Sequence, residues 1–225
     1  MSVTPLILTI DTTSEQFGLA LSRGAVLLDY RLGTSSRTLD VDLFVQIQLL
    51  LEQNTLTLAD LDGLAACIGP GSFVGTRIGL CAINSFAIVQ ALPAVGVGVL
   101  PALARLAPDS SPDQEILAAV NCVRNEYFYQ IWTGGANPRP VGPMAMARAA
   151  ELAEIAAGRP IVFRSFAMTF ARGGQRPAPP PGFEPDYLEQ LRALVALAAA
   201  QWESGRPAGD VLPAPLYLST EGTRS

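Results

Sequence analysis

Apolar and polar residues form blocks along the first part of the chain, and the period of these blocks changes in a regular order. Short apolar runs bounded by turn residues predict strands at 6–10, 17–22 and 25–31, joined by tight turns. Helical periodicity follows at 40–53, and a buried strand is predicted at 61–68. An antiparallel meander followed by a helix and a strand is typical of one half of a layered α/β fold.

A second helical pattern follows this strand. Ser72 is a natural N-cap for a helix that we expect to run to about Leu92, and 94–99 predicts another buried strand. The uncharged stretch 78–104 is long enough to cross a bilayer. Because polar residues recur within it and Pro93 interrupts it, we interpret it as a buried helix and strand instead.

The second half of the chain repeats this order more loosely. It predicts strands at 116–123 and 127–132 with a hairpin turn between them. A helix at 144–157 and a strand at 161–166 come next. The pattern therefore indicates two related halves.

We place the boundary between the halves near residue 104, giving a first half over 1–104 and a second half over 105–225. The proline-rich stretch 176–185 is expected to be extended, as a spacer or as a peptide-recognition ligand. A last helix, capped by Asp186, is expected to pack back on the first half.

The amino-acid composition narrows the range of catalytic sites that the chain could form. The 225 residues are 49% apolar and 16% charged, with a net charge of −5, no histidine, and arginine at all fifteen basic positions. Without histidine a Ser-His-Asp triad or a His-ligated zinc site is excluded. Without lysine the P-loop lysine and Schiff-base chemistry are excluded. The acidic balance argues against unaided nucleic-acid binding.

The cysteines and the N-terminus give information about the cellular compartment of the protein. Cys67, Cys81 and Cys122 are an odd set with no C-x-x-C spacing, which indicates buried thiols in a reducing environment. The N-terminus lacks the basic region of a signal peptide. We therefore expect a cytoplasmic protein.

The strongest local signal for a binding site is a glycine-rich loop between a buried strand and a helix. Gly69 and Gly71 precede Ser72, so free backbone N–H groups at the helix start could hold an anion. The alternative is a tight turn in which the glycines adopt positive φ and Ser72 caps the helix. Arg77 could contact a phosphate, but we favour a structural pair with Asp11 or another carboxylate.

A second candidate lies at the end of the first strand. Asp11 stands where phosphotransferases of the actin and sugar-kinase type place a carboxylate near Mg²⁺, and Thr12 could contact phosphate oxygens. The same residues also suit an ordinary hairpin turn. Because histidine and lysine are absent, we do not expect active phosphoryl transfer.

The two helices of the first half are apolar around more of their surface than packing on one sheet requires. Surplus apolar helix surface is typical of a partner interface, and a fully buried core helix is the alternative. The residues that we expect to face a partner are Leu43, Phe44, Ile47, Val74, Ile78 and Ala82.

Together these motifs resemble the TsaB family, also called YeaZ. The resemblance rests on Ile-Asp-Thr-Thr at 10–13, Leu-Ala-Asp-Leu-Asp at 58–62, and above all GPGSFVGTRIG at 69–79. That last segment is very close to the family's GPGSFTGxRIG. The resemblance covers 3–104 well and the second half in outline.

The resemblance implies an actin-like (ASKHA) fold of two RNase H-like halves, with mixed sheets flanked by helices. It also implies a non-catalytic scaffold that binds TsaD through its first-half helices, with TsaE joining as an ATPase. The complex transfers threonylcarbamoyl to the adenosine next to the tRNA anticodon, so tRNA would be contacted through the complex.

The same resemblance implies no metal site, no intrinsic cofactor, and ATP or ADP only at the complex interface. The exposed apolar helices favour a homodimer of the free chain. A nucleotide-dependent phosphotransferase that uses Asp11, Thr12 and the loop 69–72 stays open as an alternative. A peptidase, a label that the family has carried through its paralogue, is a third reading, which no nucleophile–base arrangement supports.

Overall fold

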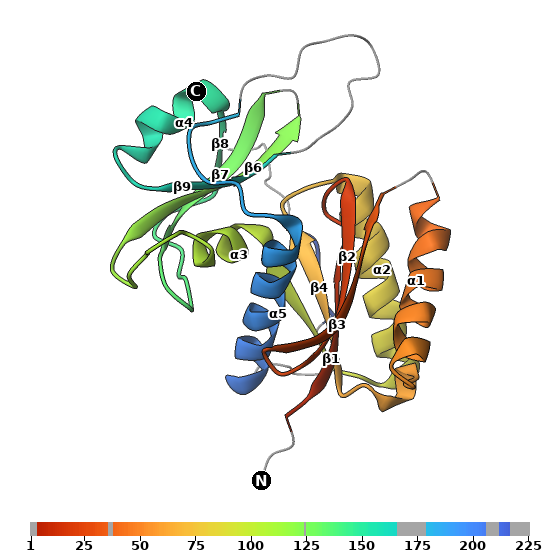
Figure 1. The fold of residues 1–225 in the computed structure, drawn as a ribbon. Helices are drawn as coiled ribbons and strands as arrows, with labels where there is room; N and C mark the ends of the chain where they lie inside the picture. Colours follow the sequence, from red (N-terminus) through yellow and green to blue (C-terminus); the bar gives the residue numbers. More distant parts are fainter. Residues whose placement is uncertain (1–3, 36–37, 124, 166–178, 206–211, 217–225) are drawn as a thin grey trace.

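Two mixed β-sheets organise the chain, one in each half of the sequence (Figure 1). The computed structural model describes residues 4–35, 38–123, 125–165, 179–205 and 212–216. In Figure 1 the sheets lie one above the other, with the N-terminal sheet below.

The first sheet has five strands in the spatial order β3-β2-β1-β4-β5. The strands are β1 Leu6–Asp11, β2 Gln16–Arg23, β3 Val26–Thr34, β4 Gly63–Gly69 and β5 Ala94–Gly98. β1 pairs antiparallel with β2 and parallel with β4. β1 is buried along its whole length, because helices cover both faces of the sheet there.

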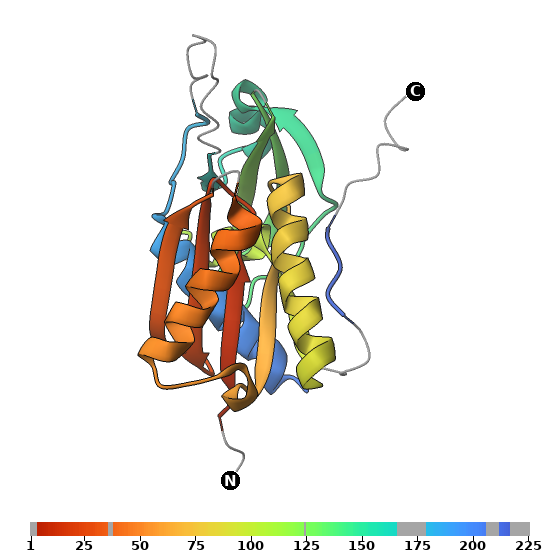
Figure 2. The same cartoon turned by 90° about the vertical axis from the view of Figure 1, so that its right-hand side faces the viewer.

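Helices α1 and α2 cover one face of this sheet, and α5 covers the other (Figure 2). The helices are α1 Leu39–Gln53, the short 3₁₀ helix η1 Leu58–Asp60, α2 Phe73–Gln90 and α5 Tyr187–Glu203. The predicted first-half strands and helices are confirmed, with ends shifted by up to three residues. Ser72 caps α2 as predicted, since its Oγ accepts a hydrogen bond from the Gly75 amide.

Among the described helices, α2 alone has the length and apolar content of a membrane span. Its inner side packs on β4 and belongs to the first hydrophobic core, through Leu80, Ile83 and Ala87. We therefore interpret α2 as a helix of the α/β layer.

The second sheet has four strands in the order β8-β7-β6-β9, which repeats the order of the first four strands of the first sheet. The strands are β6 Glu115–Val123, β7 Glu126–Thr133, β8 Ala145–Arg148 and β9 Ile161–Arg164. The segment before α5 follows β9, because the Phe163 amide donates to the Phe183 carbonyl and the Phe183 amide donates to the Ile161 carbonyl. Of the stretch expected to be extended, 183–185 runs alongside β9, 181–182 form a bend, and 176–178 lies outside the described residues.

One prediction in this half is wrong. The helix expected over 144–157 is instead strand β8 followed by the shorter helix α4, Ala149–Ala156. Pairing of β8 with β7 overrides the helical preference of this alanine-rich segment. Helix α3, Val99–Arg105, was not expected; its proline, Pro101, lies in the first turn, where an amide would have no intrahelical partner.

The halves share a hydrophobic core. It joins Ile7 and Val97 of the first sheet to Val120 of the second through Leu100 of α3 and Leu194 of α5. α3 follows the first sheet in sequence but packs mainly on β6, whereas α5 follows the second sheet and packs on the first. This exchange of helices holds the two sheets together and fixes the ends of β1 and β9 relative to each other.

Candidate functional site

The carboxyl end of β1 turns sharply at Asp11, which is fully buried. Its Oδ1 atom accepts hydrogen bonds from the Thr13 amide at 2.8 Å and from Thr13 Oγ1 at 2.6 Å. A buried carboxylate needs such donors to offset its lost hydration. The side chain of Asp11 is therefore held by its own turn.

The Gly-Pro-Gly-Ser turn between β4 and α2 packs directly on this β1 turn. The Ser72 amide donates to the Thr13 carbonyl at 2.8 Å, and Thr12 Oγ1 donates to the Gly75 carbonyl at 2.7 Å. A Cβ on Gly71 would lie 2.2 Å from the Thr13 carbonyl oxygen. The sequence candidates at the two turns are thus brought together, and glycine is required for the approach.

This packing bears on the anion-binding hypothesis. The Ser72 amide is occupied by Thr13, the Gly75 amide by Ser72 Oγ, and the Thr76 amide by the Ser72 carbonyl. Gly69 has a φ of +96°, which favours glycine there. The contacts support the reading of this loop as a tight, capped turn.

Arg164, at the end of β9, reaches across from the second half to Asp11. Its Nη1 lies 3.1 Å from Asp11 Oδ2, and its Nη2 donates to Thr13 Oγ1 at 2.7 Å. Both charged side chains are almost completely buried, at 3% and 0% exposure. Of the expected partners for Arg77, Asp11 is wrong, because Asp11 pairs with Arg164. The Arg77 guanidinium lies 3.8 Å from the centroid of the Phe73 ring.

Tyr187 and Cys67 complete this buried cluster. The Tyr187 hydroxyl donates to the Asp11 carbonyl at 3.3 Å, and Cys67 Sγ lies 3.6 Å from Thr13 Oγ1. Burial raises the pKa of Tyr187 well above its usual value, and the Asp11 carboxylate adds to the shift. Burial likewise raises the pKa of the Cys67 thiol, so that the neutral form is favoured. Cys67 therefore lacks the character of a reactive thiolate.

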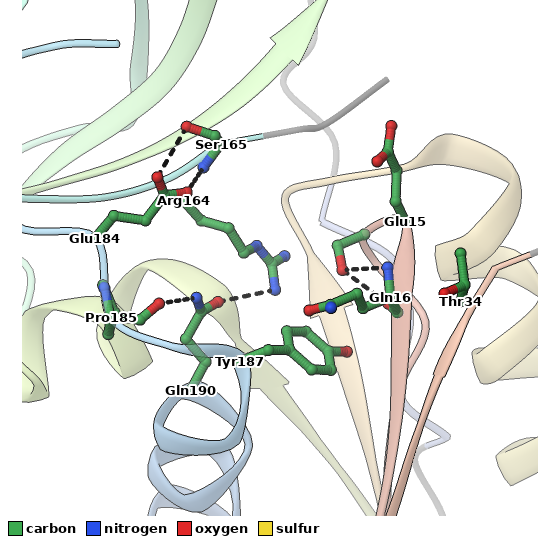
Figure 3. A pocket seen from close by; sticks show the side chains of 10 residues that line it. Glu15, Gln16, Thr34, Arg164, Ser165, Glu184, Pro185, Tyr187 and Gln190 are labelled. Atoms are coloured by element: carbon green, nitrogen blue, oxygen red, sulfur yellow. Dashed lines mark hydrogen bonds between the residues drawn. The ribbon is translucent and has the colours of Figure 1, made fainter. Parts of the chain in front are cut away.

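A cleft of about 400 Å³ opens between the halves beside Arg164 (Figure 3). It is lined by Ser14, Glu15, Gln16, Thr34, Arg164, Ser165, Glu184, Pro185, Tyr187 and Gln190. Figure 3 shows Glu184 on one wall and Glu15 on the other. Because the only cation in this lining is already paired with Asp11, the two glutamates make the cleft acidic and disfavour a polyphosphate.

The described residues give little support for a metal site or a catalytic carboxylate outside this cleft. Within the described ranges, no three His, Cys, Asp or Glu side chains gather into a group that could hold a metal ion. Both carboxylate oxygens of Asp11 accept hydrogen bonds from the protein itself. The site thus has the features of a structural lock between halves.

The predicted partner-facing residues divide into two groups. Phe44 and Val74 are exposed as expected, and Ile78 is half-buried against the first core. Leu43, Ile47 and Ala82 are almost fully buried, so their assignment to the partner surface is corrected. These three lie on the inner sides of α1 and α2, which pack on the sheet.

Residues 34–130 match the family model of TsaD, the tRNA N6-adenosine threonylcarbamoyltransferase. The chain is 32% identical over 124 residues to the tRNA threonylcarbamoyladenosine biosynthesis protein TsaB of Escherichia coli strain K12, covering 55% of this chain and 53% of that protein. The Haemophilus influenzae protein of the same name is 32% identical over 127 residues, with coverages of 56% and 53%. The chain spans about half the length of these curated relatives.

The fold is similar to that of solved structures over nearly the whole chain. For YeaZ from Pseudomonas aeruginosa the TM-score is 0.68 at 20% identity, covering 95% of this chain and 100% of that one. A second P. aeruginosa protein, described as uncharacterized with similarity to peptidase YeaZ, gives 0.70 at 19%, with coverages of 96% and 100%.

Two mixed sheets of shared strand order, flanked by helices, give the chain the fold of these YeaZ structures, which confirms the expected actin-like (ASKHA) fold with two RNase H-like halves. The matches also confirm the resemblance carried by the GPGSF segment. The chain is similar to proteins of the TsaB (YeaZ) family.

Proposed function

We propose that this chain is a non-catalytic subunit in the formation of threonylcarbamoyladenosine on tRNA, and that it binds a TsaD protein. The pathway is supported by the names of its relatives. The binding role is supported by the outer surface of α1 and α2, which is the observation that carries the proposal.

The helix surface consists of large apolar side chains that are exposed on α1 and α2, two helices that lie side by side in Figure 2. Its residues are Val41, Phe44, Val45, Leu49, Phe73, Val74, Ile88 and Val89. Single exposed apolar residues are ordinary on a soluble protein, but a contiguous group marks an interaction site. Val74 and Val89 are 65% and 78% exposed, so a partner can still bury most of their area.

A groove between the helices gives this surface its shape. Its volume is about 390 Å³, and it is lined mainly by apolar residues of α1, η1 and α2. Phe44 and Phe86 meet edge to face across it, with ring centroids 5.8 Å apart. Such a groove suits the apolar face of a partner helix.

The non-catalytic part of the proposal is supported by the lock at Asp11. Its carboxylate is committed to Arg164 and Thr13, so catalysis is assigned to the partner. We assign tRNA contact to the complex, because the chain has a net charge of −5 and would repel phosphate. We place this complex in the cytoplasm, with TsaE as a further member.

Val74→Asp tests the partner surface. Asp in the first turn of α2 is compatible with the helix dipole, so the fold is retained. Burying that charge against an apolar partner should weaken TsaD binding by at least about tenfold, which is ~1.4 kcal/mol, by isothermal titration calorimetry. Val141→Asp, an exposed valine of the second half, is the matched control. Equal binding by both variants would refute the assignment.

We also propose that nucleotide binds only at the interface of the complex. The acidic cleft and the occupied Asp11 support this placement. Mg-ATP titrated into the chain alone should release no heat, whereas ATP or ADP titrated into the complex should. Saturable binding by the chain alone would instead favour the phosphotransferase alternative.

A further inference from the structure

The Ile-Asp-Thr-Thr segment at the end of β1 and two glycines of α2 meet in one close contact. Thr12 Oγ1 donates to the Gly75 carbonyl at 2.7 Å, and Thr12 is only 1% exposed. A Cβ on Gly75 would lie 2.0 Å from the Thr12 carbonyl oxygen, and a Cβ on Gly79 would lie 2.3 Å from Thr12 Oγ1. Because Gly75 and Gly79 are one helical turn apart, they form a notch in α2 that receives Thr12.

The first turn of α2 also carries part of the helix surface. Phe73 and Val74 are 54% and 65% exposed there, whereas Gly75 is buried. Successive residues of a helix are rotated by about 100°, so Phe73 lies roughly opposite Gly75. The first turn of α2 therefore contacts Thr12 with one side and exposes large apolar side chains on the other.

The β1 turn that contains Thr12 is fixed from both halves of the chain. Asp11 Oδ1 accepts from the Thr13 amide, and Arg164 Nη2 donates to Thr13 Oγ1. The Thr13 carbonyl in turn accepts from the amide of Ser72, the N-cap of α2. A continuous set of hydrogen bonds therefore leads from the second half to the start of α2.

We propose that Thr12 is a positioning residue for TsaD binding: its hydroxyl holds the first turn of α2 in the orientation that presents Phe73 and Val74. This inference rests on the proposed function. The start of an exposed helix frays, because its first amides have no intrahelical partner. The contacts of Thr12 and Thr13 fix this start before the partner arrives, so that binding does not have to order it.

The same contact explains why Thr12 is unsuited to the ligand role considered for it. Thr12 was a sequence candidate for phosphate contact. Its hydroxyl proton is donated to a backbone carbonyl and its side chain is buried, so it is not available to a ligand. Contact with α2 is the role that its geometry supports.

Thr12→Val tests this role, because valine keeps the branched shape of threonine and removes the hydroxyl. The Gly75 carbonyl then loses its donor from the β1 turn, and the first turn of α2 is released. TsaD binding measured by isothermal titration calorimetry should weaken by about three- to tenfold. Thr12→Ser keeps the donor and should restore the wild-type affinity.

Thr9→Val is the matched control on the same strand. Thr9 is 1% exposed, as Thr12 is, but its Oγ1 has no hydrogen-bond partner among the described residues. Its replacement should leave the affinity for TsaD unchanged. Circular dichroism melts give the folded fraction of each variant, so that a loss of folded protein is not mistaken for weaker binding.

Amide hydrogen exchange provides a second measurement, which begins with the unaltered chain. The amides of Ser72, Gly75 and Thr76 donate within the free chain and should be protected before TsaD is added. In Thr12→Val they should exchange faster, whereas the amides of β6 should not change. Protection that appears only when TsaD is present would overturn the proposal, because the partner would then order this turn.

Val74→Asp, measured alongside, separates this proposal from the proposed function. If Val74→Asp weakens TsaD binding while Thr12→Val binds as tightly as Thr9→Val, the helix surface stands and Thr12 does not position it. Equal losses in Thr12→Val and Thr12→Ser would also overturn the role of the hydroxyl. If Val74→Asp binds normally, TsaD does not use this surface, and both proposals are refuted.

Discussion

The two halves share one strand order but use it differently. β1–β4 and β6–β9 follow the same plan of a meander and a parallel fourth strand, and a helix follows each fourth strand. In the first half that helix, α2, lies on its own sheet. In the second half it is α5, which crosses to the first sheet. The first sheet thus has helices on both faces, and its α1–α2 layer exposes large apolar side chains.

The ends of β1 and β9 also show that the two halves play different roles. β1 ends at Asp11 and β9 ends at Arg164, and the two meet between the halves at 3.1 Å. In open α/β sheets, ligands bind in the crevice outside the carboxyl ends of the strands. Here the second half supplies the counter-ion that closes the first-half carboxylate. The comparison teaches that the second half contributes the buried counter-ion, whereas the first half carries the surface that we propose for a partner.

Removing the lock should give the largest effect. Arg164→Leu leaves the Asp11 carboxylate buried without its cation, which should lower the free energy of unfolding by about 3–5 kcal/mol. Urea denaturation followed by circular dichroism measures this change.

Arg159→Leu is the matched control within the second half. Arg159 pairs with Glu115 at 2.6 Å, but both side chains are about one-third exposed. Surface pairs contribute about 0–1 kcal/mol. If both variants lose the same stability, Asp11 and Arg164 do not form a lock between the halves.

The next-largest loss of stability is expected when a side chain is added to the close contact between the β1 turn and the start of α2. A Cβ on Gly75 would lie 2.0 Å from the Thr12 carbonyl oxygen, so Gly75→Ala must displace backbone. We expect a loss of about 1–3 kcal/mol, although alanine is the better helix former. Gly142→Ala in the second half meets no atom within 4 Å and should be nearly neutral. A neutral Gly75→Ala would show that the turns have room to separate.

The buried cluster around Tyr187 should make the folded state less stable at alkaline pH. Because the pKa of Tyr187 is raised in the folded state, the unfolded chain loses this proton first as pH rises above about 10. Below that pH, Tyr187 makes its full contribution to the free energy of unfolding. This contribution is lost as the pH approaches the folded pKa, by up to ~1.4 kcal/mol per pH unit. Tyr187→Phe should flatten this decline in urea denaturation. Parallel curves for both proteins would contradict the role of Tyr187.

The first half could be predicted well because its signals are local. The Ser72 cap and the short apolar runs each act within a few residues. The helix expected at 144–157 failed because pairing with β7, a tertiary contact, decided its first turn.

The candidate site was predictable only in part. The two turns at Asp11 and Gly71 were found, but Arg164 lies 153 residues away from its partner in sequence, and no spacing rule links them. A charged residue ending an apolar run was the one available signal. Leu43 and Phe44 could not be separated because α1 is apolar on both sides, and only packing shows which side faces the sheet.

The helix caps should give the smallest and most direct comparison of the halves. Ser72 caps α2 and Asp186 caps α5, each accepting from the amide three residues on. Replacement of either by alanine should cost about 0.5–2 kcal/mol in urea denaturation. Only the cap of α5 is charged, so the loss in Asp186→Ala should shrink in high salt, where the helix dipole is screened. Asp186→Asn keeps the acceptor and should lose only that salt-sensitive part. A salt-independent Asp186→Ala would mean that the hydrogen bond alone holds the start of α5.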